Sequence, residues 1–261
     1  MRWVIGMDDA GVALRVLGPF QVCKWGRPVP LRSGGKAEKL LSSLAIRHRC
    51  GIGREALIET IWPDSSPELS TQCLNTLIHG LKTQFADALA GQAPVVHQHG
   101  HYVLNLDGGL KVDSLEFESA VDTGHRLLST GATEAAIEAY ERAVNFYRGD
   151  LSSESGIAGL LERERLRTVC LATLARLADA HFELANYEQA LAYAARLLEV
   201  DPCREDAHRM TMRACVRMGA RSQALRQYSV CRRLLADEFD AVPEPATEQL
   251  FAVIRTDPGA I

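Results

Sequence analysis

The alternation of apolar and polar residues predicts strands followed by two short helices in the first sixty residues. Between residues 12 and 31, apolar side chains recur at every second position on either side of a Gly-Pro break, which predicts a small antiparallel sheet. From Lys39 to Ile46 and from Leu57 to Ile61 the apolar spacing becomes helical. Pro63 ends the second of these segments because proline cannot continue a helix.

A third amphipathic helix is predicted from a cap at Ser70 or Thr71 to about Leu89. Its apolar residues recur at spacings of four, three and four and form one buried stripe, which comprises Leu74, Ile78, Leu81 and Phe85. The opposite face is polar and contains no acidic residue; it holds Gln72, Thr76, His79 and Thr83, with Asn75 and Lys82 on its flanks. Such a face suits a groove of DNA. Two short strands are predicted after it, at 95–96 and 102–106.

Helical periodicity continues from Asp113 to the last helix, which is predicted to end at about Ile254. An internal repeat is present at the period of tetratricopeptide (TPR) units: Ala180, Ala190 and Leu191 recur thirty-four positions later as Ala214, Ala224 and Leu225. Small residues at helix crossings are what stacked helix-turn-helix units require. The second half is therefore predicted to be a short all-α solenoid.

Composition places the chain among globular proteins with two modest domains. It has 261 residues, of which 47% are hydrophobic and 24% are charged. No stretch approaches the length of a membrane helix and no secretory signal is seen at the N-terminus, so a cytoplasmic protein without membrane contact is expected. The seven cysteines are scattered and never spaced as CxxC, which favours free thiols over disulfides or a zinc ribbon.

Charge divides the chain into two unlike parts. Residues 1–111 carry 12 Lys or Arg and 9 Asp or Glu, a net charge of +3, whereas residues 112–261 carry 17 and 24, a net charge of −7. This asymmetry fits a front part that faces nucleic acid and an acidic back part, although +3 is small for a DNA-binding domain.

Few patterns suggest other chemistry. His97, His99 and His101 alternate, and on one strand they would face one side and could hold zinc or copper. The alternatives are a polar turn in which Gly100 directs the third imidazole away, or a segment that gains positive charge near neutral pH. The Gly34-Gly35-Lys36 run lacks the rest of a phosphate loop. We therefore expect no enzymatic activity, no catalytic residue, no metal and no cofactor.

Several motifs, in this order, resemble those of the Streptomyces antibiotic regulatory protein (SARP) family. In the first half the motifs lie at residues 14–20, at 34–41, at 54–63, where Trp62 ends a helical segment, and at 100–104, which begins Gly-His-Tyr. In the second half they are 146–151, 162–167 and 234–239. The sequence departs from the family in the third helix, where His79-Gly80-Leu81-Lys82 stands in place of a more basic run of the Ser-Arg-Leu-Arg kind.

The resemblance implies a mainly α fold with a small β component: an N-terminal winged helix-turn-helix domain followed by an all-α, TPR-like bacterial transcriptional activator domain. The predicted boundaries are 1–11 for an N-terminal extension, for which disorder is one expectation, 12–108 for the winged helix and 112–256 for the activator domain. It also implies a sequence-specific activator that binds direct repeats in double-stranded DNA as a homodimer and recruits RNA polymerase holoenzyme.

The third helix would then read bases in the major groove, and the strands near residues 95–106 would form the wing. Candidates for base readout are Gln72, Asn75, Thr76 and His79. Candidates for phosphate contact are Lys36, Lys39, Arg54, Thr71, Lys82 and Thr83. The wing candidates are His97, Gln98, His99 and His101. A groove for a small-molecule or protein effector is predicted at Arg163, Arg167, Arg209, Arg213 and Arg217, the last three of which recur at helical spacing.

A second hypothesis belongs to another class of protein. The chain would be a TPR-type interaction or ligand-sensing module whose winged helix binds DNA weakly or not at all. Gly80 and the modest charge of the first part favour this alternative. The amphipathic third helix and the strand-turn-strand segment after it favour the regulator.

Overall fold

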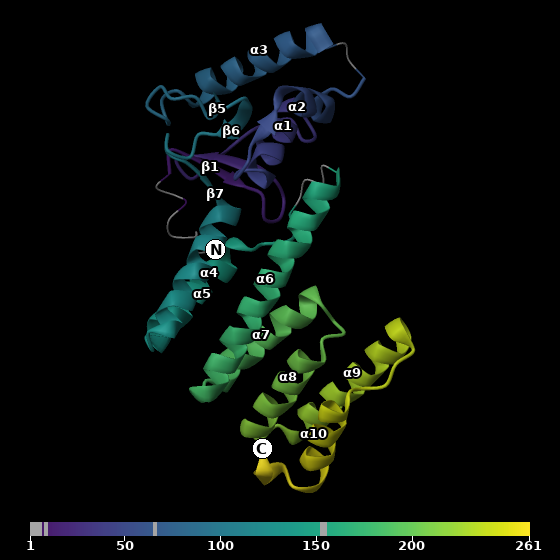
Figure 1. Ribbon diagram of the computed structural model, residues 1–261. Helices are drawn as coiled ribbons and strands as arrows, with labels where there is room; N and C mark the ends of the chain where they lie inside the picture. The colour runs from purple at the N-terminus through teal and green to yellow at the C-terminus, as the bar shows by residue number, and fades with distance from the viewer. Residues whose placement is uncertain (1–6, 8–9, 65–66, 152–155) are drawn as a thin grey trace. The chain divides into compact units, whose positions relative to one another are not determined.

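The computed structural model describes residues 7, 10–64, 67–151 and 156–261, and it confirms a mainly helical fold with few strands (Figure 1). The strands within these ranges are β1 (Val12–Arg15), β2 (Gln21–Lys24), β3 (Arg27–Val29), β4 (Ile52–Gly53), β5 (Val95–Gln98), β6 (His101–Leu104) and β7 (Leu110–Val112). The helices there are α1 (Lys36–Ile46), α2 (Arg54–Ile61), α3 (Pro67–Phe85), α4 (Asp113–Ser129), α5 (Thr133–Phe146), α6 (Gly156–Glu183), α7 (Tyr187–Val200), α8 (Glu205–Arg217), α9 (Arg221–Phe239) and α10 (Pro245–Thr256).

The chain forms two compact units. Unit 1 comprises residues 1–126 and 142–167, and unit 2 comprises residues 127–141 and 168–261. The division passes through α4, α5 and α6, so the helical region predicted as one domain at 112–256 contributes to both units. The winged-helix part and the start of the helical region therefore pack together in unit 1.

The first sheet of unit 1 has the strand order β3-β2-β1-β7. Strand β1 pairs antiparallel with β2 and parallel with β7, where Leu14 lies opposite Val112. The sheet thus extends to residue 112, past the predicted boundary at residue 108. In the preceding extension Met7 and Ala10 are buried, while the rest of the predicted extension at 1–6 and 8–9 lies outside the described residues.

The second sheet of unit 1 has the order β4-β6-β5, and three helices pack with it around one core. Strand β4 has only two residues, too few for a period-two pattern, and the sequence did not predict it. Leu40, Leu57, Ile61 and Leu74 are completely buried and come from α1, α2 and α3. Helix α3 lies along the outer edge of this unit (Figure 1).

A buried carboxylate fastens the first sheet to the helical part of unit 1. Asp113, the first residue of α4, accepts hydrogen bonds from the backbone N–H groups of Val16 at 2.8 Å and Leu17 at 3.2 Å. Its second oxygen also pairs with Arg148 at 3.3 Å. Leu17 further forms a backbone bridge with Leu151. The end of β1 is therefore held both by the start of α4 and by the segment after α5.

Unit 2 is built from helices whose small residues repeat. Ala190 and Ala224, which stand thirty-four positions apart in the sequence, are fully buried in α7 and α9. One core cluster joins α6, α7 and α8 and consists of Ala178, Phe182, Ala190, Ala194, Met210 and Ala214. The predicted TPR-like packing of helix pairs is confirmed here. Over the described ranges, every helix is too short or too polar to cross a membrane.

Candidate nucleic-acid interface

Helix α3 has one buried face and one exposed polar face, as the sequence predicts. Leu74, Leu81 and Phe85 are at most 3% exposed, and Ile78 is half-buried. The exposed residues on the other side are Gln72, Asn75, Thr76, His79, Lys82 and Thr83. Because the apolar stripe anchors the helix, the polar face is held outward.

The start and end of α3 differ from the prediction. The helix begins at Pro67, and Ser70, predicted as a cap, lies inside it with 1% of its surface exposed. Proline is favoured at the first helical position because its missing N–H would have no partner there. Thr71, a predicted phosphate contact, is half-buried one residue further on. The helix ends at Phe85, four residues before the predicted end.

The wing is a two-strand hairpin closed by a tight turn. Strands β5 and β6 pair antiparallel from Val95 opposite Leu104 to Gln98 opposite His101. His99 and Gly100 form the turn with φ values of 49° and 84°, as the twist of a two-residue hairpin requires. The four predicted wing residues, His97, Gln98, His99 and His101, are all exposed.

The three histidines do not form a metal site. His97 lies opposite Tyr102, whereas His101 lies opposite Gln98, so the two imidazoles belong to opposite faces of the hairpin. His99 occupies the turn, and its carbonyl oxygen lies 3.1 Å from His101 Nδ1. Within the described part of the chain no cluster of His, Cys, Asp or Glu could hold a metal ion. The alternative of a zinc or copper site on one strand is therefore wrong.

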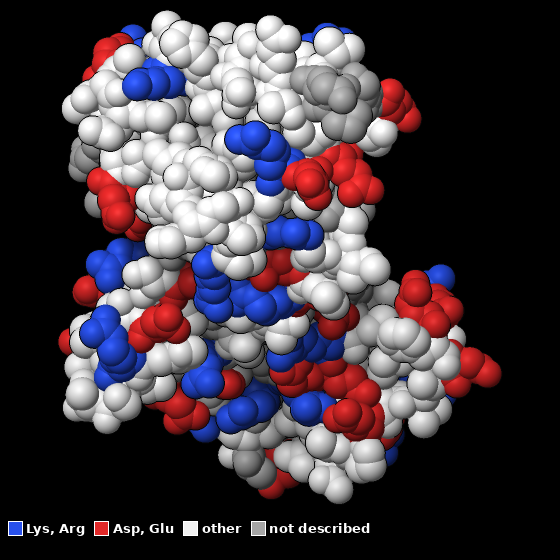
Figure 2. All heavy atoms as spheres, turned by 45° about the horizontal axis from the view of Figure 1, so that its top comes forward, with Lys and Arg blue, Asp and Glu red and all other residues white. Residues whose placement is uncertain are grey.

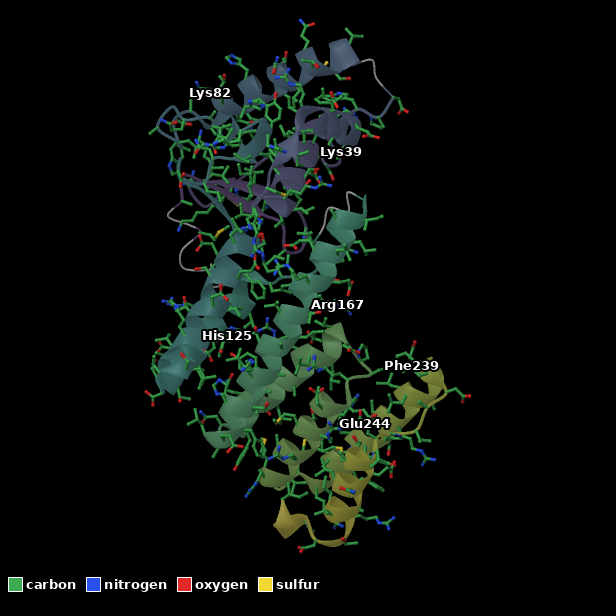
Figure 3. All side chains as sticks on the ribbon, in the orientation of Figure 1. Lys39, Lys82, His125, Arg167, Phe239 and Glu244 are labelled. Carbon is green, nitrogen blue, oxygen red and sulfur yellow. The ribbon has the colours of Figure 1, made fainter. Side chains whose placement is uncertain are left out.

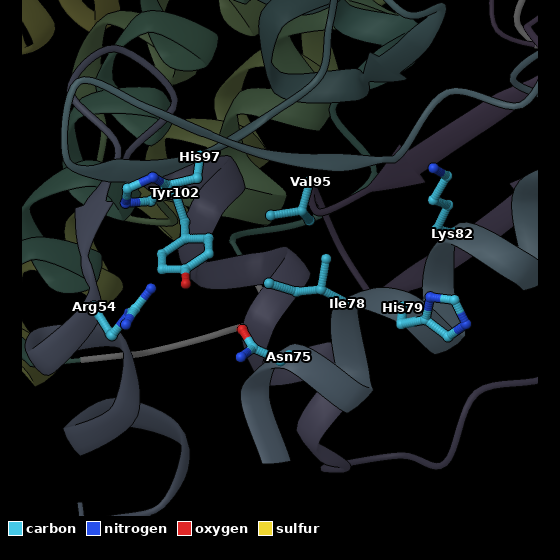
Figure 4. Close-up of a pocket in the computed structure, with 8 residues that line it drawn as sticks. All are labelled: Arg54, Asn75, Ile78, His79, Lys82, Val95, His97 and Tyr102. Carbon is cyan, nitrogen blue, oxygen red and sulfur yellow. The ribbon is translucent and has the colours of Figure 1, made fainter. Parts of the chain in front are cut away.

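A groove of about 390 Å³ runs between α3, the first residue of α2 and the wing (Figure 4). It is lined by Arg54, Asn75, Ile78, His79, Lys82, Val95, His97 and Tyr102. Five of these eight residues are sequence-predicted contacts from all three elements. Sequence reasoning did not select Tyr102, although the Gly-His-Tyr segment pointed to it; its ring centroid lies 4.9 Å from that of His97.

The predicted phosphate contacts fall into two groups. Lys36 donates a hydrogen bond to the Ile61 carbonyl at 2.6 Å, and its ammonium lies 5.6 Å from the Trp62 ring. The Lys36 ammonium therefore binds the C-terminal end of α2, where free carbonyls attract cations, and is less available for a phosphate. Lys39 and Lys82 are exposed on α1 and α3 (Figure 3), and Arg54 is exposed at the start of α2.

The threonine hydroxyls on α3 are partly engaged. Thr76 donates to the Gln72 carbonyl at 2.9 Å, and Thr83 donates to the His79 carbonyl at 3.1 Å. Such bonds to the preceding turn are common for threonine in helices. Each hydroxyl oxygen keeps lone pairs that can accept a hydrogen bond.

Charge is sparse around this surface. The face of the winged-helix part in Figure 2 is mostly uncharged, with scattered basic and acidic side chains. One cation near the end of α3 is already paired, because the partly buried Lys24 contacts Asp87 at 2.6 Å. That contact lowers the pKa of the Asp87 carboxyl. The uncharged groups of α3 thus make up most of the exposed polar face.

The five arginines predicted to line one effector groove are divided between the units. Arg163 and Arg167 belong to unit 1, where Arg163 donates to the Leu151 carbonyl at 2.9 Å and Arg167 lies 3.9 Å from Asp150. In unit 2, Arg209 and Arg213 line one pocket, and Arg217 is exposed outside it. Of the five predicted residues, Arg209 and Arg213 line the same pocket.

Known proteins resemble this chain both in sequence and in fold. The family described as Bacterial transcriptional activator domain matches residues 112–255, more than half of the chain. The solved structure of Mycobacterium tuberculosis EmbR in complex with a low-affinity phosphopeptide superposes with a TM-score of 0.74 at 22% identity. The match covers 94% of this chain and 65% of that one, so the two share a fold.

Two curated relatives are similar along almost the whole chain. Regulatory protein DnrI of Streptomyces peucetius is 26% identical over 256 residues, which cover 94% of this chain and 93% of DnrI. Regulatory protein AfsR of Streptomyces coelicolor is 26% identical over 259 residues, or 96% of this chain. This chain spans only a quarter of the length of AfsR.

Proposed function

The chain belongs to the bacterial transcriptional activator domain family as a SARP-type regulator, and from this membership we propose that it regulates transcription by binding DNA through α3 and the wing. The relatives are named as regulatory proteins and transcriptional regulators, not as enzymes. The supporting observation is the exposed polar face of α3, with Gln72, Asn75, Thr76 and His79, beside the groove that Arg54, His97 and Tyr102 complete.

In this proposal α3 enters the major groove and the wing contacts the neighbouring backbone or minor groove. Gln72, Asn75, Thr76 and His79 read base edges with amide, hydroxyl and imidazole groups. Lys39, Arg54 and Lys82 contact phosphates and fix the register of the protein on the duplex. The exposed wing residues His97, Gln98, His99 and His101 add contacts at the edge of the same surface.

The finer parts of the proposal follow from the family. We infer that the chain binds direct repeats upstream of promoters as a homodimer in the cytoplasm, and that it activates transcription by recruiting RNA polymerase holoenzyme. A DNA segment with two repeats places two protomers side by side on one face when the repeats are about one helical turn apart.

The test is binding of the full chain to fragments of its own upstream region, compared with a genomic DNA pool. Thr76→Ala and His79→Ala remove candidate base contacts and should each cost about 1–3 kcal/mol on the preferred site while changing its sequence preference. Lys82→Ala should weaken binding to all sequences alike, because a phosphate contact carries no sequence information. Arg233→Ala, an exposed charge on α9 in unit 2, is the matched control.

Two outcomes contradict the proposal. If the wild-type chain binds no fragment more tightly than random DNA at low salt, α3 is not a DNA reader and the interaction-module alternative gains support. If binding is tight but the Thr76→Ala, His79→Ala and Lys82→Ala variants all match the Arg233→Ala control, the DNA-binding surface lies elsewhere.

A further inference from the structure

A second hollow, of about 340 Å³, lies within unit 2 between α6, α8 and α10. It is lined by Asp179, Asp206, Arg209, Met210, Arg213, Ala246 and Leu250. Four of these seven side chains are charged, two of each sign. The other three are apolar and give the pocket a nonpolar surface beside its charges. None of these residues takes part in the proposed DNA contact.

Two of the four charged groups already have partners. Asp206 accepts two hydrogen bonds from the Arg204 guanidinium, at 2.8 and 2.9 Å. Arg209 donates to Thr247 at 2.8 Å and pairs at 3.2 Å with Glu244, which immediately precedes α10 and is labelled in Figure 3. The contacts of Arg209 tie α8 to α10 at the wall of the pocket. Such partners leave Asp206 and Arg209 with little capacity to hold a ligand.

The other two charged groups, Asp179 and Arg213, have no hydrogen bond or ion pair within the described ranges of the chain. Arg213 lies with its guanidinium carbon 4.3 Å from the centre of the Phe182 ring, so one planar face is covered while the N–H donors at its edge remain available. Phe182 is itself buried in the helix core, which holds the arginine in place.

Asp179 is an acceptor in the same pocket. Partial burial raises the pKa of its carboxyl, Arg213 opposes this rise, and the nearby Asp206 and Glu183 add to it. A carboxylate that is partly removed from water without a bonded partner is costly. A cationic ligand group would relieve that cost, and an anionic ligand group would do the same for Arg213.

We propose that this pocket binds a small zwitterion of amino-acid to dipeptide size, with its ammonium on Asp179, its carboxylate on Arg213 and an apolar side chain on Met210 and Leu250. The volume is at the small end of the range for ligand pockets, which favours a ligand of this size over a folded partner or a large cofactor. The three helices that meet here would be held together by the ligand, so occupancy would stabilise unit 2.

The test measures binding of leucine, methionine, phenylalanine and the dipeptide Leu-Leu to the full chain by calorimetry, up to about 10 mM, the weak end of the affinity scale. Two analogues of leucine each lack one charge: 4-methylpentanoate lacks the ammonium, and 3-methylbutylamine lacks the carboxylate. We expect at least one zwitterion to bind at one site per chain and to raise the unfolding temperature. Each singly charged analogue should bind roughly tenfold to a hundredfold more weakly.

The variants locate the site. Asp179→Asn and Arg213→Met each remove one charge while keeping similar size, and each should weaken zwitterion binding by roughly tenfold or more. Glu199→Gln and Arg217→Met change exposed charges on α7 and α8 outside the pocket and should bind as the wild type does. Circular dichroism confirms that all four are folded, and DNA affinity is recorded separately.

Three results would overturn the inference. They are failure of every zwitterion to bind the folded chain, equal binding of the singly charged analogues, and unchanged binding by both Asp179→Asn and Arg213→Met. None of these readouts depends on DNA, so failure here is distinguishable from failure of the proposed DNA contact.

Discussion

Asp113 places a carboxyl group where it is shielded from water, with 2% of its side chain exposed. Burial raises the pKa of Asp113 to about 6, although the N–H groups of Val16 and Leu17 and the charge of Arg148 oppose this rise. The hydrogen bonds position the carboxylate at the end of β1, and its desolvation makes the ionised form unfavourable. No local pattern predicts this contact, because it joins residues ninety-seven positions apart.

We expect Asp113 to make unit 1 less stable as the pH rises. The folded state binds this proton with a pKa of about 6 against an ordinary value of 3.8, so between these values the folded state holds more protons than the unfolded chain. The stabilising contribution is complete below about pH 4 and is lost as the pH rises through 6, for a total of about 3 kcal/mol.

The measurement compares urea unfolding of the wild type and Asp113→Asn from pH 4.5 to 7.5, followed by tryptophan fluorescence. Trp25 and Trp62 lie in unit 1 and unit 2 contains no tryptophan, so the signal reports on unit 1. The wild type should lose stability relative to the variant as the pH rises. A stability difference that stays constant over this range would show that the carboxyl titrates normally.

At the scale of single elements, α3 combines an anchored apolar stripe with a weak point at Gly80. This glycine is exposed in mid-helix, and a methyl group added to it would meet no atom within 4 Å. Gly80→Ala should therefore stabilise unit 1 by about 1 kcal/mol, because alanine loses less backbone entropy in a helix. Urea unfolding at constant pH measures the free energy of unfolding of the variant and the wild type. A destabilised variant would mean that the backbone at residue 80 is not helical in solution.

Gly80 is also where the helix departs from the basic run of its family. Gly80→Arg adds a cation in the turn between His79 and Lys82, beside the polar face. It should raise affinity for DNA several-fold at low salt and less at high salt, since the gain is electrostatic. Gly80→Ala is the matched control for the change in helix stability. Equal affinities of the two variants would place residue 80 away from the DNA.

How far the sequence predicted each element depended on its length and on local signals. The buried stripe of α3 and the wing were predictable, because four apolar residues at helical spacing and a Gly-containing turn between short strands are local patterns. Strands β4 and β7 have two and three residues, too few for a periodic signal, and form only through pairing with β6 and β1. Ser70 was mistaken for a cap because Pro67 closes a turn-rich run and was assigned to the turn, although proline at the first helical position is an equally local signal.

The sequence predicted which residues are exposed at the site, but not which of their charged side chains are already bonded within the protein. The exposed positions on α3 followed from periodicity, which fixes which residues share a face. The bond from Lys36 to the Ile61 carbonyl could not be predicted, because it depends on how α1 packs against the end of α2. The same holds for Arg163, whose guanidinium is held by the Leu151 carbonyl twelve residues earlier. Tertiary contacts, rather than residue type, decide which cations remain available.

For the whole molecule, the low positive charge of the front part limits how DNA binding responds to salt. Of the predicted phosphate contacts, Lys39, Arg54 and Lys82 are exposed and lack an ion pair within the described residues. Three phosphate contacts per protomer predict a slope of about −3 for the logarithm of the binding constant against that of the salt concentration. Fluorescence anisotropy on a one-repeat DNA measures it. A slope steeper than about −6 would require a larger basic surface than the one on α3 and its neighbours.

The same slope tests whether two chains bind together. If two protomers occupy adjacent direct repeats through equivalent surfaces, a two-repeat DNA should show twice the slope of a one-repeat DNA, about −6, because each protomer releases its own counterions. Analytical ultracentrifugation should find two chains on the two-repeat DNA, and moving one repeat by half a helical turn should abolish cooperative binding, since the second surface then faces the opposite side of the duplex. One chain on the two-repeat DNA, with an unchanged slope, would mean that this regulator binds DNA as a monomer.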